Sequence, residues 1–247
     1  SGNVRFAWAV GTTWLGSMTA SQDFMKTFVR LTTESPHQIR SVETATADLI
    51  ARSDAGGMVV VDQDIYLRDP IGSKYADIVL PAATWGEDNF SRANGERRIR
   101  LYSKFYDAPG ESKPDWWIAA EVGKRLGFDG FQWKDSNDVF EEAARFTRGS
   151  RKDYMPLVWL AKQTGKKGHD LLREYGTTGI QGPIRYENGA LVGTKRLHDS
   201  TLKLDTPQGP TIHSKIMTAF NSQTGKANFM KSPWSHFSDF YEFMKPR

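Results

Sequence analysis

Residues 58–100 constrain the fold more than any other stretch of the chain. They open with an apolar, β-branched run at 58–61 behind two glycines, which is typical of a strand buried on both faces of a parallel sheet. Three polar residues, Asp62, Gln63 and Asp64, follow at once and predict the end of that strand. In open α/β sheets, ligands bind outside the carboxyl ends of the strands. The sequence therefore predicts a binding site at Asp62 to Asp64.

The neighbouring segments alternate between strand and helix patterns. An apolar run at 5–10 predicts a strand that ends at Gly11, and a second burst at 78–80 predicts another strand that Pro81 closes. Between the first two strands, helical spacing predicts a helix over 21–31, which Ser21 could cap, and a weaker one over 42–51. This order is that of a doubly wound α/β unit, and no G-x-G-x-x-G motif of a standard NAD site is present.

The second half of the sequence is rich in helix patterns and then becomes irregular. Helices are predicted over 115–126, capped by Asp115, and over 136–148, 157–162 and 168–175, whereas turn residues dominate from 176 and Asn188-Gly189 marks a hairpin. The predicted fold class is therefore α/β, with a doubly wound Rossmann-like sheet, an α-rich extension and an irregular C-terminal connection. We divide the chain at residues 112 and 175, which gives the segments 1–112, 113–175 and 176–247.

Composition excludes several classes of function. The chain has no cysteine, which rules out disulfides, cysteine-ligated zinc, cysteine nucleophiles and ligation of an iron–sulfur cluster by these residues. The formal charge of +4 is spread among acids without a basic stripe, so nucleic-acid binding is not predicted. No apolar run approaches the roughly 20 residues of a membrane-spanning helix, and the N-terminal residues lack the pattern of a signal peptide.

The polar cluster at Asp62, Gln63 and Asp64 admits three interpretations. A carboxylate at a strand end can accept two N–H bonds from a guanine edge or bind a ribose diol. Two carboxylates can also bind a hard cation, and such residues can simply cap the following turn. From the residues alone these alternatives stay open.

A guanidinium cluster follows the turn at Asn94-Gly95. Arg97, Arg98 and Arg100 could grip phosphates or carboxylates, but their alternation with apolar residues also fits a strand with one face in water. Glu87 is expected to partner one of these arginines. No histidine lies close enough in sequence to form a catalytic dyad, so no catalytic residue is proposed. His198 and His213 are too isolated for a metal pair, whereas Arg185, Lys195 and Arg196 could line a route to an anionic site.

Two ordered segments carry a resemblance to a known family. They read ADIVLPAATWGEDNFSRANGERRIR over 76–100 and DAPGESKPDWWIAAEVGKRLG over 107–127. Together they resemble the large subunits of molybdopterin oxidoreductases of the dimethyl sulfoxide reductase superfamily. Matching pieces extend from about Phe6 to the C-terminus, and NGERRIRL with KFYDAPG is most similar to the arsenite oxidase large subunit.

The resemblance implies a molybdenum bis(molybdopterin guanine dinucleotide) cofactor. It places the loop after the first strand against the dinucleotide and the polar cluster beside a guanosine, and we add the guanidinium of Arg98 as a phosphate partner. In this sequence Thr13 replaces the usual Asn, and residues 69–74 replace a Thr-rich loop. The implied cofactor-binding residues are Gly11, Thr12, Thr13, Asp62, Gln63, Asp64 and Arg98, with no metal ligand among them.

The resemblance also implies that this chain is an interior segment of a longer catalytic subunit. Residues 1–112 would bind the guanosine end of the cofactor, 113–175 would be the helical part of the same domain, and 176–247 would lead toward a final domain. An iron–sulfur cluster would be ligated outside this chain. Expected partners are a small oxyanion substrate, a Rieske-type small subunit and an electron carrier such as a cytochrome, all in the periplasm.

The resemblance favours oxidation of arsenite to arsenate by oxygen-atom transfer. Reduction of another oxyanion, iodate or arsenate, by a close relative is the alternative within the family. A stand-alone, non-catalytic nucleotide-binding module and a metal-dependent hydrolase using Asp62 and Asp64 are alternatives outside it.

Overall fold

The chain divides into two compact units. The structure, a computed structural model, describes residues 3–33, 41–67, 71–200, 205–206, 209–210, 218–220 and 222–229. The first unit holds Ser1–Phe90 with Tyr102–Val139, and the second holds Ser91–Leu101 with Phe140–Arg247. The sequence-based division at residues 112 and 175 follows stretches of the chain rather than contacts, and it stays a prediction. His213 and residues 230–247 lie outside the described part.

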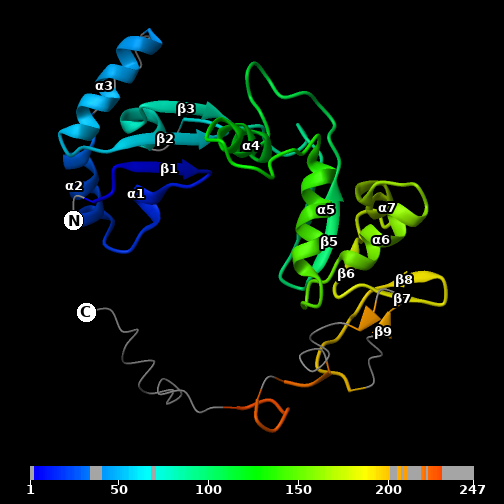
Figure 1. Ribbon diagram of the computed structural model, residues 1–247. Coiled ribbons are helices and arrows are strands. Elements are labelled where there is room, and N and C mark those ends of the chain that lie inside the picture. The colour runs from blue at the N-terminus through cyan, green and yellow to red at the C-terminus, as the bar shows by residue number, and fades with distance from the viewer. Residues whose placement is uncertain are drawn as a thin grey trace. The chain divides into compact units, whose positions relative to one another are not determined.

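A three-stranded parallel sheet forms the centre of the first unit. β2 (Val59–Asp64) lies between β1 (Phe6–Val10) and β3 (Ile78–Pro81), as Figure 1 shows. The connection from β1 to β2 contains α1 (Trp14–Ser17), α2 (Ser21–Leu31) and α3 (Val42–Asp54). The π-helical turn η1 (Ile71–Tyr75) leads into β3, and α4 (Asp115–Arg125) follows later in the chain. The predicted α/β class with parallel strands is confirmed.

The sequence placed the end of β2 too early. The strand continues through the polar residues, because Asp62 pairs with Ala9 and Gln63 with Val10, and Asp64 pairs with Pro81 on the other side. Asp62 and Gln63 are paired on both sides and Asp64 on one, so these polar side chains do not end the strand.

Two predicted helix caps are wrong. Ser21 is the first residue of α2, and the cap position is Ala20, whose left-handed backbone (φ 55°) makes no side-chain cap. Asp115 is likewise the first residue of α4, and Pro114 precedes it at the cap position. The Asp115 carboxylate is therefore available for a contact outside its own helix.

The core of the first unit lies on one face of the sheet. Ala7, Ala9 and Val60 are buried there with Phe28 of α2, Ile71 and Tyr75. The rings of Phe28 and Tyr75 meet edge to face with centroids 5.6 Å apart. Complete burial of each large apolar side chain contributes about 1.5–3 kcal/mol. This core fixes the position of β2, and therefore of the polar residues at its end.

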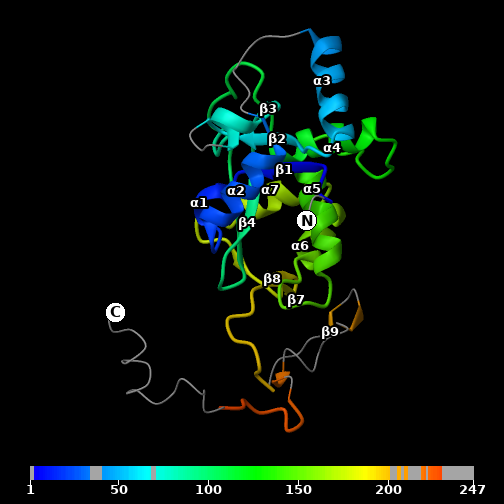
Figure 2. The ribbon, with the colours of Figure 1, turned by 90° about the vertical axis from the view of Figure 1, so that its left-hand side faces the viewer.

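The second unit combines a small sheet with three helices. β5 (Arg98–Tyr102) lies between β4 (Phe90–Ala93) and β6 (Ile180–Gln181) and pairs antiparallel with β6. α5 (Ser136–Thr147) enters this unit from the first, and α6 (Met155–Gln163) packs against α7 (Gly168–Arg173). β7 (Arg185–Glu187) and β8 (Ala190–Val192) form a hairpin (Figure 2), and β9 (Asp205–Thr206) pairs with β10 (Gly209–Pro210).

The predicted hairpin turn at Asn188-Gly189 is confirmed. Both residues have positive φ, 50° for Asn188 and 84° for Gly189. A two-residue loop with positive φ at both positions matches the twist of the flanking strands, and Asn-Gly is the preferred sequence for it.

A second core joins the sheet and helices of the second unit. Ile99 of β5 and Ile180 of β6 are buried against α5, α6 and α7. Tyr154, just before α6, belongs to this core with 4% of its surface exposed, and its hydroxyl donates to the Arg97 carbonyl oxygen at 3.2 Å. Burial raises the pKa of Tyr154 to about 12, while the nearby Arg97 opposes this increase.

The shifted pKa of Tyr154 predicts a loss of stability at alkaline pH. The unfolded phenol ionises near its ordinary value of 10.0, whereas the folded one keeps its proton until about 12. The contribution of Tyr154 to the free energy of unfolding is complete below pH 10. It falls by up to about 2–3 kcal/mol as the pH rises toward 12. Urea unfolding of Tyr154→Phe across this range should show a shallower fall. Part of the fall will remain, because burial also raises the pKa of Tyr175. Parallel falls for both proteins would contradict the assignment.

A search of the described helices finds none that is both long and apolar enough to span a membrane.

Candidate functional site

The loops that follow β1, β2 and β3 begin at one edge of the parallel sheet. The Gly11 amide donates to the Gln63 carbonyl oxygen at 2.9 Å, and the Ala82 amide donates to the Asp64 carbonyl oxygen at 3.0 Å. Six of the seven predicted cofactor-binding residues therefore lie at this carboxyl edge: Gly11, Thr12, Thr13, Asp62, Gln63 and Asp64. Because parallel strands end in the same direction, the topology alone assembles them.

Gln63 holds an unusual buried oxygen at this edge. Its side chain is 2% exposed, and its Nε2 donates to the Asp115 Oδ1 of α4 at 2.6 Å. Among the residues that the structure describes, its Oε1 has no hydrogen-bond partner. A buried acceptor without a partner costs about 1–3 kcal/mol. An N–H or O–H group of a ligand at the edge would remove that cost.

Asp62 and Asp64 lie on the face of β2 opposite to Gln63, because successive strand residues point to opposite faces. The Asp62 side chain is completely buried, whereas Asp64 is partly exposed. The Ile65 amide donates to the Asp64 Oδ1 at 2.7 Å. An ionised carboxylate has about four acceptor sites, so Asp64 retains capacity for further donors.

The backbone conformation at position 11 favours a glycine. Its φ is +54°, and a Cβ built there would meet no atom within 4 Å. The space beside it is therefore open, and a close approach by another part of the chain does not explain the glycine. The next residues begin α1, whose first carbonyl acceptor is that of Thr13.

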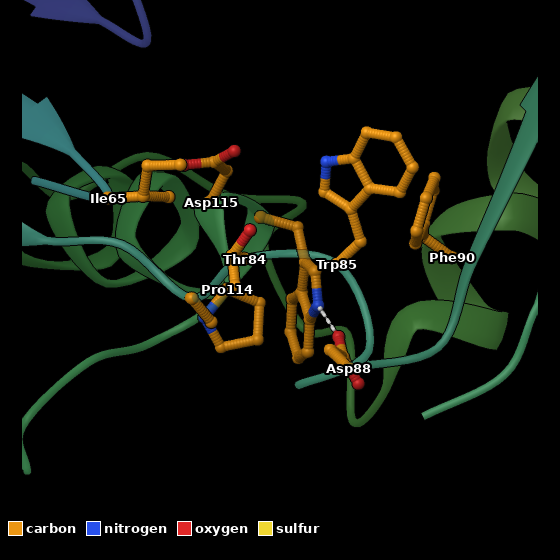
Figure 3. A pocket seen from close by; sticks show the side chains of 9 residues that line it. Ile65, Thr84, Trp85, Asp88, Phe90, Pro114 and Asp115 are labelled. Atoms are coloured by element: carbon orange, nitrogen blue, oxygen red, sulfur yellow. Dashed lines mark hydrogen bonds between the residues drawn. The ribbon is translucent and has the colours of Figure 1, made fainter. Parts of the chain in front are cut away.

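A cavity of about 410 Å³ opens where the chain leaves β2 and β3. We call it the carboxyl-edge cavity; it is lined by Ile65, Thr84, Trp85, Asp88, Asp115 and Trp116, among others. Figure 3 shows the Ile65 and Asp115 side chains on one side and the Trp85 and Phe90 rings on the other. The Trp116 Nε1 donates to the Asp88 Oδ2 at 2.8 Å.

The chemistry of the carboxyl-edge cavity favours a ligand that donates hydrogen bonds. Its walls are mainly apolar and aromatic, and its ionisable side chains are the carboxylates of Asp88 and Asp115. Trp85 is 67% exposed, so its ring can stack on a planar group. A planar base with N–H donors fits this lining, whereas a free anion would be repelled by the carboxylates. Among its described lining residues, no set of groups is arranged for proton transfer.

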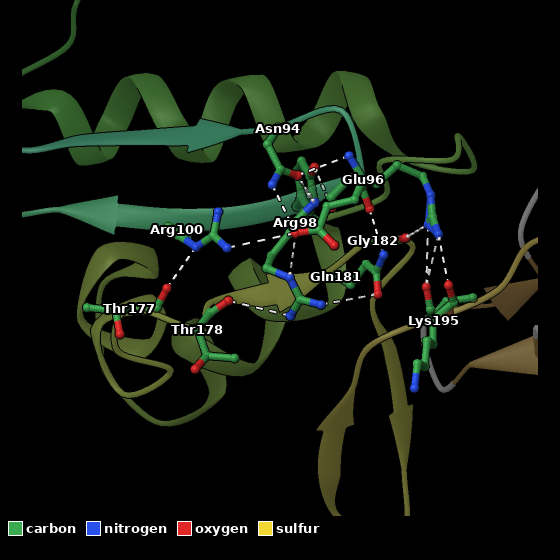
Figure 4. A network of polar contacts seen from close by, with 12 residues as sticks. Asn94, Glu96, Arg98, Arg100, Thr177, Thr178, Gln181, Gly182 and Lys195 are labelled. Atoms are coloured by element: carbon green, nitrogen blue, oxygen red, sulfur yellow. Dashed lines mark hydrogen bonds and ion pairs between the residues drawn. The ribbon is translucent and has the colours of Figure 1, made fainter.

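Arg98 is placed in the second unit, so the structure does not group it with the other six residues. Its Nε donates to Glu96 Oε1 at 3.1 Å, and its two terminal nitrogens lie 3.4 Å from the Thr178 carbonyl oxygen and 3.5 Å from Gln181 Oε1. Figure 4 shows these contacts around β5. Hydrogen bonds from Asn94 and then Arg98 lower the pKa of Glu96. The guanidinium thus links β5 to β6, and its predicted contact with the cofactor stays a prediction.

Glu87 does not partner an arginine as expected. Its side chain is buried, and its Oε2 accepts from the Thr84 amide at 2.8 Å, which holds the turn beside the carboxyl-edge cavity. Within the part of the chain that the structure describes, no three His, Cys, Asp or Glu side chains gather as a metal site.

Sequence reasoning missed the roles of Asp115, Asp88 and Trp116. The sequence predicts Asp115 only as a helix cap, whereas in the structure it accepts the hydrogen bond from Gln63. Asp88 and Trp116 are far apart in sequence, and nothing in either local pattern predicts their bond. The sequence Pro114-Asp115-Trp116 offers one signal, because a proline before the aspartate can take the cap position and leave the carboxylate for another contact.

Comparisons with known proteins bear on this edge directly. Residues 42–125, which contain β2, β3 and α4, match a family model described as molybdopterin oxidoreductase. The whole chain is 54% identical over 254 residues to the iodate reductase subunit IdrA of Denitromonas iodatirespirans, of which it covers 28%. It is 53% identical over 253 residues to the protein of the same name in Pseudomonas sp. (strain SCT), with the same 28% covered.

A more distant relative is the arsenite oxidase subunit AioA of Herminiimonas arsenicoxydans. The identity is 34% over 196 residues, which covers 73% of this chain and 21% of that protein. The chain thus spans between 21% and 28% of the length of these curated relatives.

Proposed function

The chain belongs to the molybdopterin oxidoreductase family, and from this premise we propose that it is a segment of a catalytic subunit that reduces an oxyanion, with iodate as the substrate. The choice of iodate as the substrate is supported by the 54% identity to an iodate reductase subunit over the entire chain. Oxidation of arsenite, which the sequence motifs favoured, is the second candidate, because the arsenite oxidase subunit is 34% identical over 73% of the chain.

The family implies a molybdenum–molybdopterin cofactor, and the residues at the carboxyl edge fit one end of it. We propose the guanine dinucleotide form. The buried Gln63 Oε1 has no partner among the described residues, and Asp64, on the opposite face of β2, retains acceptor capacity at the same edge. A guanine edge presents adjacent N–H donors, which are the groups that such acceptors bind. The open space beside Gly11 leaves room for the backbone to approach the ligand.

When bound, the cofactor supplies two-electron and oxygen-atom chemistry, which no side chain provides by itself. Removal of one oxygen from an oxyanion as water consumes two electrons and two protons, whereas oxidation of arsenite releases them. The residues of this chain bind and orient the cofactor and shield it from water. The Rieske-type subunit, the cytochrome, the iron–sulfur cluster outside this chain and the periplasmic location remain proposals from the resemblance.

The direction of electron flow tests the proposal. The native polypeptide that carries this sequence should be purified, its denatured mass and molybdenum content measured, and its turnover assayed. We expect a mass several times 27.9 kDa and consumption of iodate with a reduced dye. Arsenite turnover with an oxidised dye, without iodate turnover, would replace the main proposal by the second candidate. A polypeptide near 27.9 kDa without molybdenum would exclude both and favour a nucleotide-binding module.

A further inference from the structure

A cavity of about 530 Å³ in the second unit is lined by cations without a carboxylate among its described lining residues. It lies at the turn between β4 and β5, the end of α5 and the loop that follows α5. We call it the basic cavity. Its lining includes Arg97, Phe146, Ser150, Arg151 and Lys152.

Arg97 is a fixed positive charge in this wall. Its Nη1 donates to the Gly182 carbonyl oxygen at 2.8 Å, and its Nη2 donates to the Thr194 carbonyl oxygen at 3.2 Å. Figure 4 shows these bonds at the side of the network where Gly182 and Lys195 lie. Neutral carbonyl oxygens hold the guanidinium in position but do not cancel its charge.

Arg151 and Lys152 add two exposed charges to the same wall. Neither forms an ion pair within the described residues. Burial lowers the pKa of Arg97, and repulsion from Arg151 contributes further in the same direction. Arg97 and Arg151 therefore repel each other at an electrostatic cost that an anion would relieve, and Lys152 lines the same cavity.

The acids nearest in sequence have other partners. Both Asp153 oxygens accept backbone bonds, from Gly149 at 2.7 Å and Met155 at 3.0 Å, and the side chain is 3% exposed. Glu96 pairs with Arg98 and Arg100, and its charge also offsets part of the lowering of the Arg97 pKa. The Ser150 hydroxyl accepts from the Lys152 amide at 3.1 Å, so its proton is available to a ligand. The cavity thus offers donors and positive charge, with few acceptors.

We propose that the basic cavity binds an oxyanion group, either a small free oxyanion or the phosphate of a larger molecule. Arg151 supplies a planar fork of donors, Lys152 a point charge and Ser150 a hydroxyl, which is the donor set that phosphate-like groups bind. The exposed ring of Phe146, with 82% of its surface accessible, borders the same space and can cover a planar group attached to a phosphate. This site lies in the second unit and does not depend on the cofactor or substrate proposed above.

Calorimetric titration of the native polypeptide that carries this sequence tests the site. Inorganic phosphate, sulfate and iodate are compared with chloride at matched ionic strength, and adenosine 5′-monophosphate forms a further arm. We expect saturable oxyanion binding with a Kd on the order of millimolar, and at least about tenfold weaker binding after Arg151→Ala with Lys152→Ala. Much tighter binding of the nucleotide than of phosphate would identify a phosphate on a larger molecule, and equal affinities would identify the free oxyanion.

A matched control removes the same two charges from the first unit. Lys124→Ala with Arg125→Ala on α4 should leave the affinity within about twofold of the wild type, because neither side chain lines the basic cavity and salt screens exposed charges. Should the Arg151/Lys152 pair of substitutions lower Tm, the single variants Arg151→Gln and Lys152→Gln provide the same comparison. The proposal is overturned if phosphate binds no better than chloride, or if removal of the two cavity charges changes the affinity no more than the control.

Discussion

Replacing Asp64 with alanine in the complete molybdenum-containing subunit is expected to lower its molybdenum content per polypeptide by about tenfold or more. Asp64 ends the central strand at the carboxyl edge, and within the described part of the chain only its Oδ1 accepts a hydrogen bond, from the Ile65 amide at 2.7 Å. Each charge-assisted bond from a guanine N–H contributes about 1.5–3 kcal/mol, and alanine removes them. Metal analysis and the guanine nucleotide released on denaturation measure the loss without reliance on turnover.

An aspartate elsewhere in the same unit provides the control for this variant. Asp54 is exposed at the end of α3, and Asp54→Ala removes an equal charge without touching the carboxyl edge. It should retain normal molybdenum and guanine contents, whereas Asp64→Asn should show an intermediate loss because it keeps one acceptor oxygen. Normal contents in Asp64→Ala would remove Asp64 from the proposed site, although membership of the family would stand.

The location of the carboxyl edge was predictable because it depends on local patterns and a general rule of topology. The apolar runs at 58–61 and 78–80 indicate two parallel strands. The polar residues that follow the first run indicate where its carboxyl end lies. Parallel strands separated by helices end at one edge, so Gly11 and Asp62 to Asp64 come together without any long-range information. The buried state of Gln63 also follows, once the strand is extended to include it.

The contacts that complete the edge were not predictable from the sequence. The bond between Gln63 and Asp115 joins residues 52 positions apart, and the bond between Asp88 and Trp116 joins residues 28 apart. Such pairings depend on how α4 packs, which periodicity does not specify. Arg98 could be placed only by the structure: its guanidinium belongs to the second unit and links β5 to β6, and its predicted contact with a phosphate stays a prediction.

Replacing Gly179 with alanine is expected to lower the free energy of unfolding by at least about 3 kcal/mol. Gly179 directly precedes β6 and has a φ of +64°, which alanine adopts at a cost of about 1–2 kcal/mol. A Cβ there would also lie 2.2 Å from the Ile99 carbonyl oxygen of β5. That atom belongs to the backbone of a paired strand, so it can move only if β5 and β6 separate. Ile99 and Ile180, which pair across these strands, are each 4% exposed in the core and would lose packing.

Gly189 separates the two causes of this loss. It has a φ of +84° in the turn between β7 and β8, but a Cβ there would meet no atom within 4 Å. Gly189→Ala should therefore cost only the about 1–2 kcal/mol of the left-handed backbone. Urea unfolding of both variants gives the difference, which measures the close approach of Gly179 to β5 and is expected to be about 2 kcal/mol. Equal losses would show that backbone conformation alone demands both glycines, and that the two strands can part at this point without disturbing the core.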